Sequence, residues 1–175
     1  DGDGKMKALL GGKGAGLAEM TRLGLPVPPG FTITTAVCNH WFRNGEHYPE
    51  GFWEELHRGV KLLEERTGKR FGDAANPLLV SVRSGAAISM PGMMDTVLNL
   101  GSNDSSVEAL AARTGDRRFA LDSYRRFIQM FSKVVLDLEG DLFENAIVAI
   151  KTEKGVKNDT DLTADDLSEL VSTFK

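Results

Sequence analysis

The feature that most constrains the fold is a cluster of prolines: three of the six prolines in the chain fall within residues 26–29. Each proline fixes its own φ angle and disfavours a helical conformation in the residue before it, so residues 25–30 must be extended. Before this cluster, apolar residues recur every three positions over residues 17–23, which predicts a short amphipathic helix that Gly24 can terminate. The prolines therefore separate an N-terminal helix from the segments that follow.

The segments after the prolines alternate between strand and helix signals. Alternating apolar and polar side chains at residues 31–34 predict a half-buried strand. A helix then begins at Thr34 or Thr35, since either hydroxyl can cap it. Apolar residues over 52–63 form one stripe of a further helix, which ends near Gly68.

Two strands are expected on either side of a long loop. Pro77 introduces residues 78–82, which form the strongest strand candidate in the chain. A loop over residues 84–95 follows, and residues 96–100 form a second strand that is stopped by Gly101.

The remainder of the chain, residues 102–175, has an almost wholly helical pattern. Apolar residues recur at helical spacing from Tyr124 to Leu138, and a further helix is expected over residues 142–154. A capping box at Thr163 opens a last helix. We therefore expect an α+β fold with two parts: a small sheet with helices over residues 1–101, and a helical subdomain over residues 102–175.

Charge and cysteine content exclude several classes of protein. A net charge of -4 argues against a nucleic-acid binder, which usually has a basic face. No apolar run approaches the roughly 18 residues that span a bilayer, and the polar residues 1–5 do not resemble a signal peptide. The single Cys38 fits a reducing compartment. We expect an intracellular protein, cytoplasmic or in an organelle such as a plastid, with neither nucleic acid nor membrane as a partner.

The first candidate binding segment is the glycine-rich run at residues 11–16, which contains Lys13. Glycines there let the backbone approach a ligand, a following helix offers free N–H groups, and Lys13 adds a mobile positive charge. The run lacks the spacing of a P-loop. A flexible turn with a solvated lysine is the alternative interpretation.

The second candidate is Arg83, which the strand at residues 78–82 delivers to the start of the loop. Because an unpaired buried guanidinium is costly, an arginine at the end of a buried strand must pair with something. A structural ion pair with a carboxylate is one interpretation. An anionic ligand is the other, since arginine presents a fixed fork of donors.

The third candidate is the last part of the methionine-rich loop, together with the first residue of the strand that follows it. Its residues are Gly92, Met93, Met94, Asp95 and Thr96. Clustered methionines usually fill a core, but a proline- and glycine-containing loop between two strands lies at the surface. The amide groups of such a loop could fold over a polyphosphate, and Thr96 would add a hydroxyl.

Other polar residues favour structural roles. The histidines at 40, 47 and 57 show no metal-ligand spacing, so we expect no metal site and no catalytic side chain. Arg125 and Arg126 flank an apolar helix stripe and are expected to form salt bridges. The acidic residues between 159 and 166 are interpreted as a solvated run.

The candidate segments lie in an order that is familiar from one family of enzymes. The segments are LLGGKGAGLAEM (9–20), VPPGF (27–31), LVSVRSGA (79–86), MPGMMDTVLNLG (90–101), YRRFIQMF (124–131) and DLTADDL (161–167). Together they resemble the N-terminal part of the nucleotide-binding domain of the pyruvate, phosphate dikinase family, along essentially the whole chain. Ala87 stands where relatives often have a second arginine.

This resemblance implies an ATP-grasp-like fold and a phosphotransferase that is longer than this chain. The family converts ATP, phosphate and pyruvate into AMP, pyrophosphate and phosphoenolpyruvate with Mg²⁺, through a phosphohistidine. By resemblance, Lys13 and Arg83 contact the ATP phosphates, and the loop from Gly92 to Thr96 covers them. The implied partners are a second ATP-grasp lobe, a phosphohistidine domain and a pyruvate-binding barrel through which the family dimerises. The Mg²⁺ ligands are expected in those further parts, and the isolated chain is expected to be inactive.

Three other interpretations stay open at this point. Phosphoenolpyruvate synthase and glucan, water dikinase share the glycine-lysine and proline-glycine elements, although the methionine loop favours the dikinase that uses pyruvate and orthophosphate. A chain of this length could also be a non-catalytic module kept for binding a partner.

Overall fold

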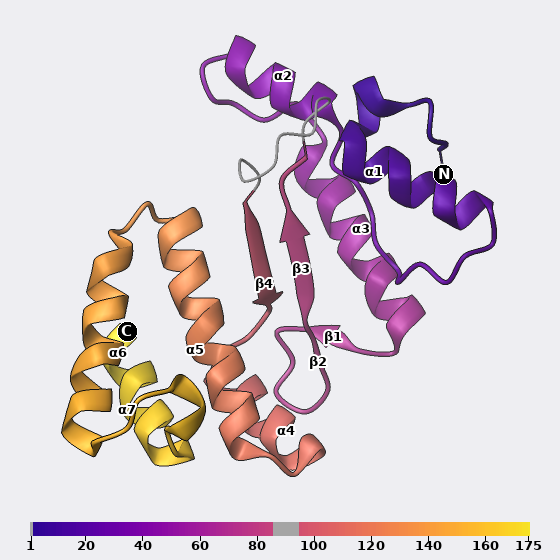
Figure 1. Cartoon of the computed structure of the whole chain (residues 1–175). Helices are drawn as coiled ribbons and strands as arrows, with labels where there is room; N and C mark the ends of the chain where they lie inside the picture. The colour runs from indigo at the N-terminus through magenta and orange to yellow at the C-terminus, as the bar shows by residue number, and fades with distance from the viewer. Residues whose placement is uncertain (1, 86–94) are drawn as a thin grey trace. The chain divides into compact units, whose positions relative to one another are not determined.

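A computed structural model of the chain describes residues 2–85 and 95–175. Contacts divide it into two compact units: unit 1 comprises Asp1–Gly68 and Arg83–Met94, and unit 2 comprises Lys69–Val82 and Asp95–Lys175. The expected boundary between residues 101 and 102 stays a prediction. By contacts, the strands after Gly68 group with the helices that follow, because β4 (Thr96–Leu100) packs against α5 (Arg117–Val134) (Figure 1). The architecture is helix-rich with small sheets, which agrees with the expected α+β class.

The described part of unit 1 has three helices: α1 (Lys7–Arg22), α2 (Thr35–Arg43) and α3 (Phe52–Thr67). Helix α3 ends where the apolar stripe predicted, because Gly68 adopts the left-handed conformation that glycine tolerates at a helix C-terminus. Helix α2 begins after Thr34, but the Thr34 side chain makes no cap hydrogen bond. The Thr35 hydroxyl instead donates to the Ala8 carbonyl at 2.6 Å and ties α2 to α1.

Four aromatic rings pack at the junction of α2 and α3. Tyr48 stacks on Phe52 with ring centroids 4.5 Å apart, and Trp41 and Trp53 close the cluster at 4.4 and 5.1 Å from Tyr48. Both tryptophans of the chain therefore belong to unit 1. Indole fluorescence reports on that unit alone.

The strand expected at residues 31–34 does not form among the described residues. The segment runs into Thr34, whose backbone is extended, but no hydrogen bond joins it to a neighbouring strand. Its side chains instead contact α1 and α3 through Gly14 and Gly59. The alternating pattern was sufficient for an extended backbone, whereas a strand also needs a partner.

Unit 2 begins with short strands. Strand β1 (Arg70–Phe71) pairs in parallel with β2 (Pro77–Leu78), with Arg70 opposite Pro77. Strand β3 (Val80–Arg83), which crosses into unit 1 at its last residue, pairs with β4 (Thr96–Leu100), and the two run in opposite directions (Figure 1). Gly101, which ends β4 as predicted, has a φ of 104°, and a Cβ there would lie 2.7 Å from the Leu78 carbonyl oxygen. Only glycine fits this turn.

The rest of unit 2 consists of α4 (Asp104–Thr114), α5 (Arg117–Val134), α6 (Gly140–Lys154), a 3-10 turn η1 (Asp159–Asp161) and α7 (Ala164–Phe174). The predicted capping box at Thr163 is confirmed, since its hydroxyl accepts from the Asp166 amide at 3.2 Å. Helix α5 ends before Val135 and Leu138, both of which are exposed, so the predicted length was too great. Asp137, with a φ of 54°, turns the chain away from the helical path.

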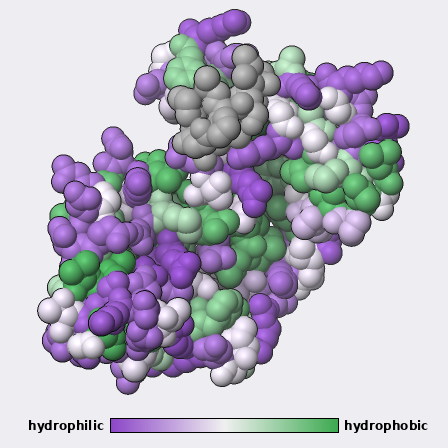
Figure 2. All heavy atoms as spheres, in the orientation of Figure 1, coloured by the Kyte–Doolittle hydropathy of each residue, from purple (hydrophilic) through white to green (hydrophobic). Residues whose placement is uncertain are grey.

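One hydrophobic core holds these helices together. Other hydrophobic residues lie outside this core and are exposed at several separate places on the surface (Figure 2). No helix of the described residues is long and apolar enough to cross a bilayer. The core lies among α4, α5, α6 and α7 and comprises Val107, Ala120, Leu121, Tyr124, Ile147, Ile150, Leu162, Leu167, Leu170 and Val171.

Candidate functional site

The glycine-rich run lies inside α1 rather than before it. Gly11 has a φ of 69° and a ψ of 170°, a left-handed backbone that breaks the helix into two segments and favours glycine. Lys13 therefore sits in the first turn of the second segment. The expected lysine at a helix start is present, but Gly11 produces that start by a kink.

The glycines of the run have different roles. A Cβ on Gly14 would lie 3.1 Å from both Cγ2 and Oγ1 of Thr32, so this glycine allows α1 to approach the extended segment after the prolines. A Cβ on Gly16 would meet nothing within 4 Å in the described residues. The sequence assigned the whole run to ligand approach; in the structure Gly14 serves internal packing.

Lys13 joins the glycine run to the segment that follows β3. Its side-chain Nζ donates a hydrogen bond to the Ser84 carbonyl oxygen at 3.1 Å. The two residues are separated by 71 positions in sequence, and both belong to unit 1. This bond places the lysine ammonium one residue away from Arg83 along the chain.

Arg83 is exposed at the end of β3 and forms no ion pair with any described carboxylate. Its neighbours Ser81 and Val82 are exposed as well, so the premise of a fully buried strand was wrong, and no burial cost obliges Arg83 to pair. Lys13 also lacks a carboxylate partner among the described residues. Lys13 thus lies beside the segment that carries Arg83, and neither side chain has a carboxylate partner among the described residues. Unneutralised cationic side chains of this kind are what an anion site requires.

The loop residues divide between described and undescribed parts. Gly92, Met93 and Met94, like Ala87, lie outside the described residues. Asp95 is exposed, and Thr96 is half-buried at the start of β4; both belong to unit 2. The structure therefore brings together Lys13 and the Arg83–Ser84 segment, and the role of the loop stays a prediction.

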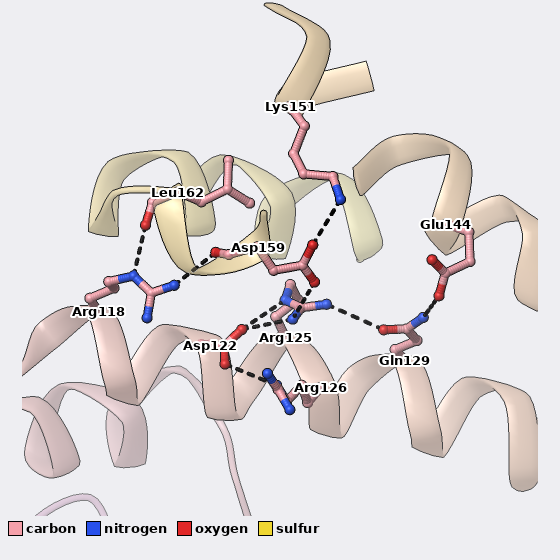
Figure 3. Close-up of polar contacts among 9 residues, drawn as sticks. All are labelled: Arg118, Asp122, Arg125, Arg126, Gln129, Glu144, Lys151, Asp159 and Leu162. Atoms are coloured by element: carbon pink, nitrogen blue, oxygen red, sulfur yellow. Dashed lines mark hydrogen bonds and ion pairs between the residues drawn. The ribbon is translucent and has the colours of Figure 1, made fainter. Parts of the chain in front are cut away.

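A second polar cluster lies on α5 and was only partly anticipated (Figure 3). Arg125 is buried and bonds to Asp122 at 2.7 Å and to Asp159 at 3.5 Å. Arg126 pairs with the other oxygen of Asp122 at 2.9 Å. The predicted salt bridges of the two arginines are confirmed, and their donors are used by the fold.

Asp159 was interpreted as part of a solvated acidic run, and that interpretation was wrong. Its carboxylate accepts from the Lys151 ammonium at 2.9 Å as well as from Arg125, and its carbonyl accepts from Arg118 at 2.8 Å. The Lys151 hydrogen bond lowers the pKa of the Asp159 carboxyl, and the charges of Lys151 and Arg125 add to this effect. The cluster ties the turn at η1 to α5 and α6 (Figure 3).

The histidines make local contacts. The Nδ1 atom of His57 lies 2.7 Å from the Trp53 carbonyl oxygen, and that of His47 lies 2.7 Å from the Gly45 carbonyl oxygen. Within residues 2–85 and 95–175, no group of three or more histidine, cysteine or acidic side chains could hold a metal ion.

Comparison with known proteins follows the same segments. Residues 7–50 match the family described as "Pyruvate phosphate dikinase, AMP/ATP-binding domain". The chain is 56% identical over 174 residues to pyruvate, phosphate dikinase of Entamoeba histolytica, covering 99% of this chain and 20% of that protein. It is 56% identical over 175 residues to pyruvate, phosphate dikinase of Clostridium symbiosum, covering 100% of this chain and 20% of that protein. It is 58% identical over 175 residues to the chloroplastic pyruvate, phosphate dikinase 1 of Oryza sativa, covering 100% of this chain and 18% of that protein.

The chain spans about a fifth of the length of the curated relatives that it matches. The matched family region contains Lys13 and the proline cluster, whereas the similarity to the relatives extends to Arg83 and through all of unit 2.

Proposed function

We propose that this chain, which belongs to the pyruvate, phosphate dikinase family, is the N-terminal part of the nucleotide-binding domain, and that Lys13 and Arg83 contact the phosphates of ATP there. The observation that supports the proposal is the hydrogen bond from Lys13 to the Ser84 carbonyl, which places the lysine ammonium next to the segment that carries Arg83 in unit 1. Neither cationic side chain has a carboxylate partner among the described residues.

The chemistry of phosphoryl transfer fits these residue types. The reaction asks a protein mainly to align the phosphates and to neutralise the charge that develops on their oxygens. Lys13 contributes a compact ammonium that is held half-buried by its bond to Ser84. Arg83 contributes a planar fork of donors that matches two phosphate oxygens at once. The main-chain amides of Gly92, Met93 and Met94, with Asp95 and Thr96, form the proposed cover over the phosphates.

The wider reaction follows from the family. In it, ATP, orthophosphate and pyruvate become AMP, pyrophosphate and phosphoenolpyruvate through a phosphohistidine on a separate domain. Mg²⁺ supplies charge neutralisation to such a reaction when it is bound. By resemblance to the family, we propose that the carboxylates that hold Mg²⁺ lie in other parts of the polypeptide. We also propose that unit 1 belongs to an ATP-grasp fold, whose second lobe closes the nucleotide site.

Kinetics of the two half-reactions in the complete polypeptide test the assignment. Lys13→Met and Arg83→Lys should each slow the nucleotide half-reaction by about 10- to 1000-fold, the scale of losing a charge-assisted contact of about 1.5–4 kcal/mol. Exchange between pyruvate and the phosphohistidine should be unchanged. Arg58, an exposed arginine of α3 paired with Glu55, provides the control, and Arg58→Lys should leave both half-reactions intact.

Equal loss of both half-reactions in the Lys13 variant would show a structural role instead. An Arg83→Lys protein with unchanged nucleotide kinetics would refute the assignment of Arg83.

A further inference from the structure

Residues 30–33 have no backbone hydrogen bond to any described part of the chain. Neither the amide nor the carbonyl groups of Gly30, Phe31, Thr32 and Ile33 have a main-chain partner there. The next carbonyl, that of Thr34, accepts only from Val37 at the start of α2. The side chains of Phe31 and Ile33 are 43% and 51% exposed. Toward the described residues, the backbone hydrogen-bonding groups of this short segment are therefore unpaired.

Two helices nevertheless hold this segment as they would hold a strand. The Phe31 ring packs on α3, where a Cβ on Gly59 would lie 3.0 Å from it. Thr32 packs on α1, where a Cβ on Gly14 would lie 3.1 Å away. Successive side chains of a strand point to opposite faces, and glycines let a helix approach the backbone closely. The contacts of Phe31 and Thr32 follow this alternation.

The sequence of the segment agrees with that placement. Phe31, Thr32, Ile33 and Thr34 are aromatic or β-branched residues, the types that fit a pleated surface best. An exposed extended edge of such residues is a template for another strand, and proteins usually pair or cover it. Prolines precede the segment but none lies within it, so each of its amides can donate.

We propose that residues 31–34 become a β-strand by pairing with a strand contributed by another part of the same polypeptide, outside residues 1–175. The inference rests on the proposed function, in which this chain is one part of a longer dikinase. The relatives that it matches are about five times its length and have ample sequence for such a strand.

An intramolecular partner is favoured over a second copy of the chain by the energetics of a short strand. Pairing along one edge of four residues forms only a few hydrogen bonds, and the net contribution of each to stability is small because it replaces a bond to water. Association of two separate molecules loses translational and rotational freedom, a cost that a few such bonds do not offset. A strand of the same polypeptide does not bear that cost in full. A pairing as short as this one is therefore stable only within a single polypeptide.

Residue-resolved hydrogen exchange, measured without nucleotide, tests the proposal. In the isolated chain, the amides of residues 31–34 should exchange at nearly the rate of an unfolded peptide. In the complete polypeptide they should be slowed by at least about 100-fold. Because alternate residues of a strand bond to the same neighbour, one partner strand should protect Phe31 and Ile33 or else Thr32 and Thr34.

Equal exchange in the isolated chain and the complete polypeptide would overturn the proposal. Protection that appears in the isolated chain and grows with its concentration would also overturn it, by showing a second copy on the same edge. The half-reaction kinetics of the Lys13 and Arg83 variants are measured separately. Unchanged kinetics with protected amides would refute the ATP-phosphate assignment alone, and unprotected amides with impaired kinetics would refute the strand alone.

Discussion

The two units of this chain differ in how completely they bury their own apolar surface. Unit 2 encloses a continuous core among four helices. In the described part of unit 1, Ala15 and Leu63 are the buried hydrophobic residues, while large apolar side chains from every helix are exposed. The candidate phosphate contacts and the open strand segment both belong to unit 1.

This difference in apolar burial indicates that the two units have different roles. A unit that buries its own core can be stable alone, whereas a unit with exposed apolar surface needs further structure to cover it. Ligand-binding segments also tend to come from the less stable parts of a protein. We interpret unit 2 as a self-sufficient support and unit 1 as a functional part that other segments complete.

The largest expected loss of stability comes from a substitution in the buried polar cluster of unit 2. Arg125→Ala removes a guanidinium that is 4% exposed and leaves the carboxylates of Asp122 and Asp159 short of a partner. Breaking a buried pair in this way costs about 3–5 kcal/mol. Urea unfolding followed by circular dichroism measures the loss.

Arg126→Ala is the matched control for that variant. Arg126 also pairs with Asp122, but its side chain is 60% exposed, so we expect a loss of about 0–1 kcal/mol. Equal losses for the two arginines would show that the buried cluster does not support unit 2 as described.

A pair of leucine truncations compares the two cores directly. Leu167 in α7 is 0% exposed, and Leu167→Ala should lower the free energy of unfolding by about 2–5 kcal/mol. Leu17 in α1 is 46% exposed, and Leu17→Ala should cost less than about 1 kcal/mol in the isolated chain. Tryptophan fluorescence reports the unfolding of unit 1 alone, whereas circular dichroism reports the helices of both units. A large loss at Leu17 would contradict the proposed incompleteness of unit 1.

The glycines of α1 sharpen the comparison within unit 1. Gly11→Ala places a side chain at a φ of 69° and should destabilise the unit by about 1–3 kcal/mol. Gly16→Ala meets nothing within 4 Å and should stabilise the helix by about 0.5–1 kcal/mol, as alanine does in a helix interior. The midpoint of unfolding by tryptophan fluorescence separates the two. A stabilising Gly11→Ala would contradict the kinked helix.

The smallest expected effect is on acid stability. The pKa of Asp159 in unit 2 is lowered from 3.8, first by its hydrogen bond from Lys151. A carboxyl whose folded pKa is depressed adds stability above its unfolded pKa and loses it as pH falls through the folded value. Asp159→Asn should therefore lower stability at pH 6 by about 1 kcal/mol or less, and the difference from wild type should vanish once the pH falls below the lowered folded pKa of Asp159.

Glu19 provides the contrast in unit 1. Its hydrogen bond from Arg22, together with one from the Gly4 amide, lowers the pKa of this half-buried carboxyl from 4.5 to about 2. Glu19→Gln should release the N-terminal turn from α1 without changing the unfolding of unit 2.

For Asp159, a difference in stability between wild type and Asp159→Asn that does not depend on pH would contradict the ion-pair assignment.

Local signals were enough to predict much of this fold. Gly68, Gly101 and Thr163 each terminate or begin an element through groups a few residues away, and the structure confirms all three. The strand at residues 31–34 could not be settled in the same way, because a strand depends on a partner distant in sequence.

The site shows the same limit. The motif identified Lys13, but neither its bond to Ser84 nor the exposure of Arg83 could be derived from spacing. Asp159 looked solvated because its partners Arg125 and Lys151 lie on other helices. Long-range electrostatic contacts leave little trace in a single sequence.

Calorimetric titration of the isolated chain with ATP, with and without Mg²⁺, tests most directly the claim that unit 1 carries an incomplete phosphate site. Lys13 and Arg83 are present, but a closing lobe and a group of metal ligands are not among the described residues. We predict a dissociation constant of about 0.1–10 mM, which corresponds to about 3–5 kcal/mol. Mg²⁺ should change this affinity little. Micromolar, magnesium-dependent binding would contradict the claim, because the chain would then build a complete nucleotide site by itself.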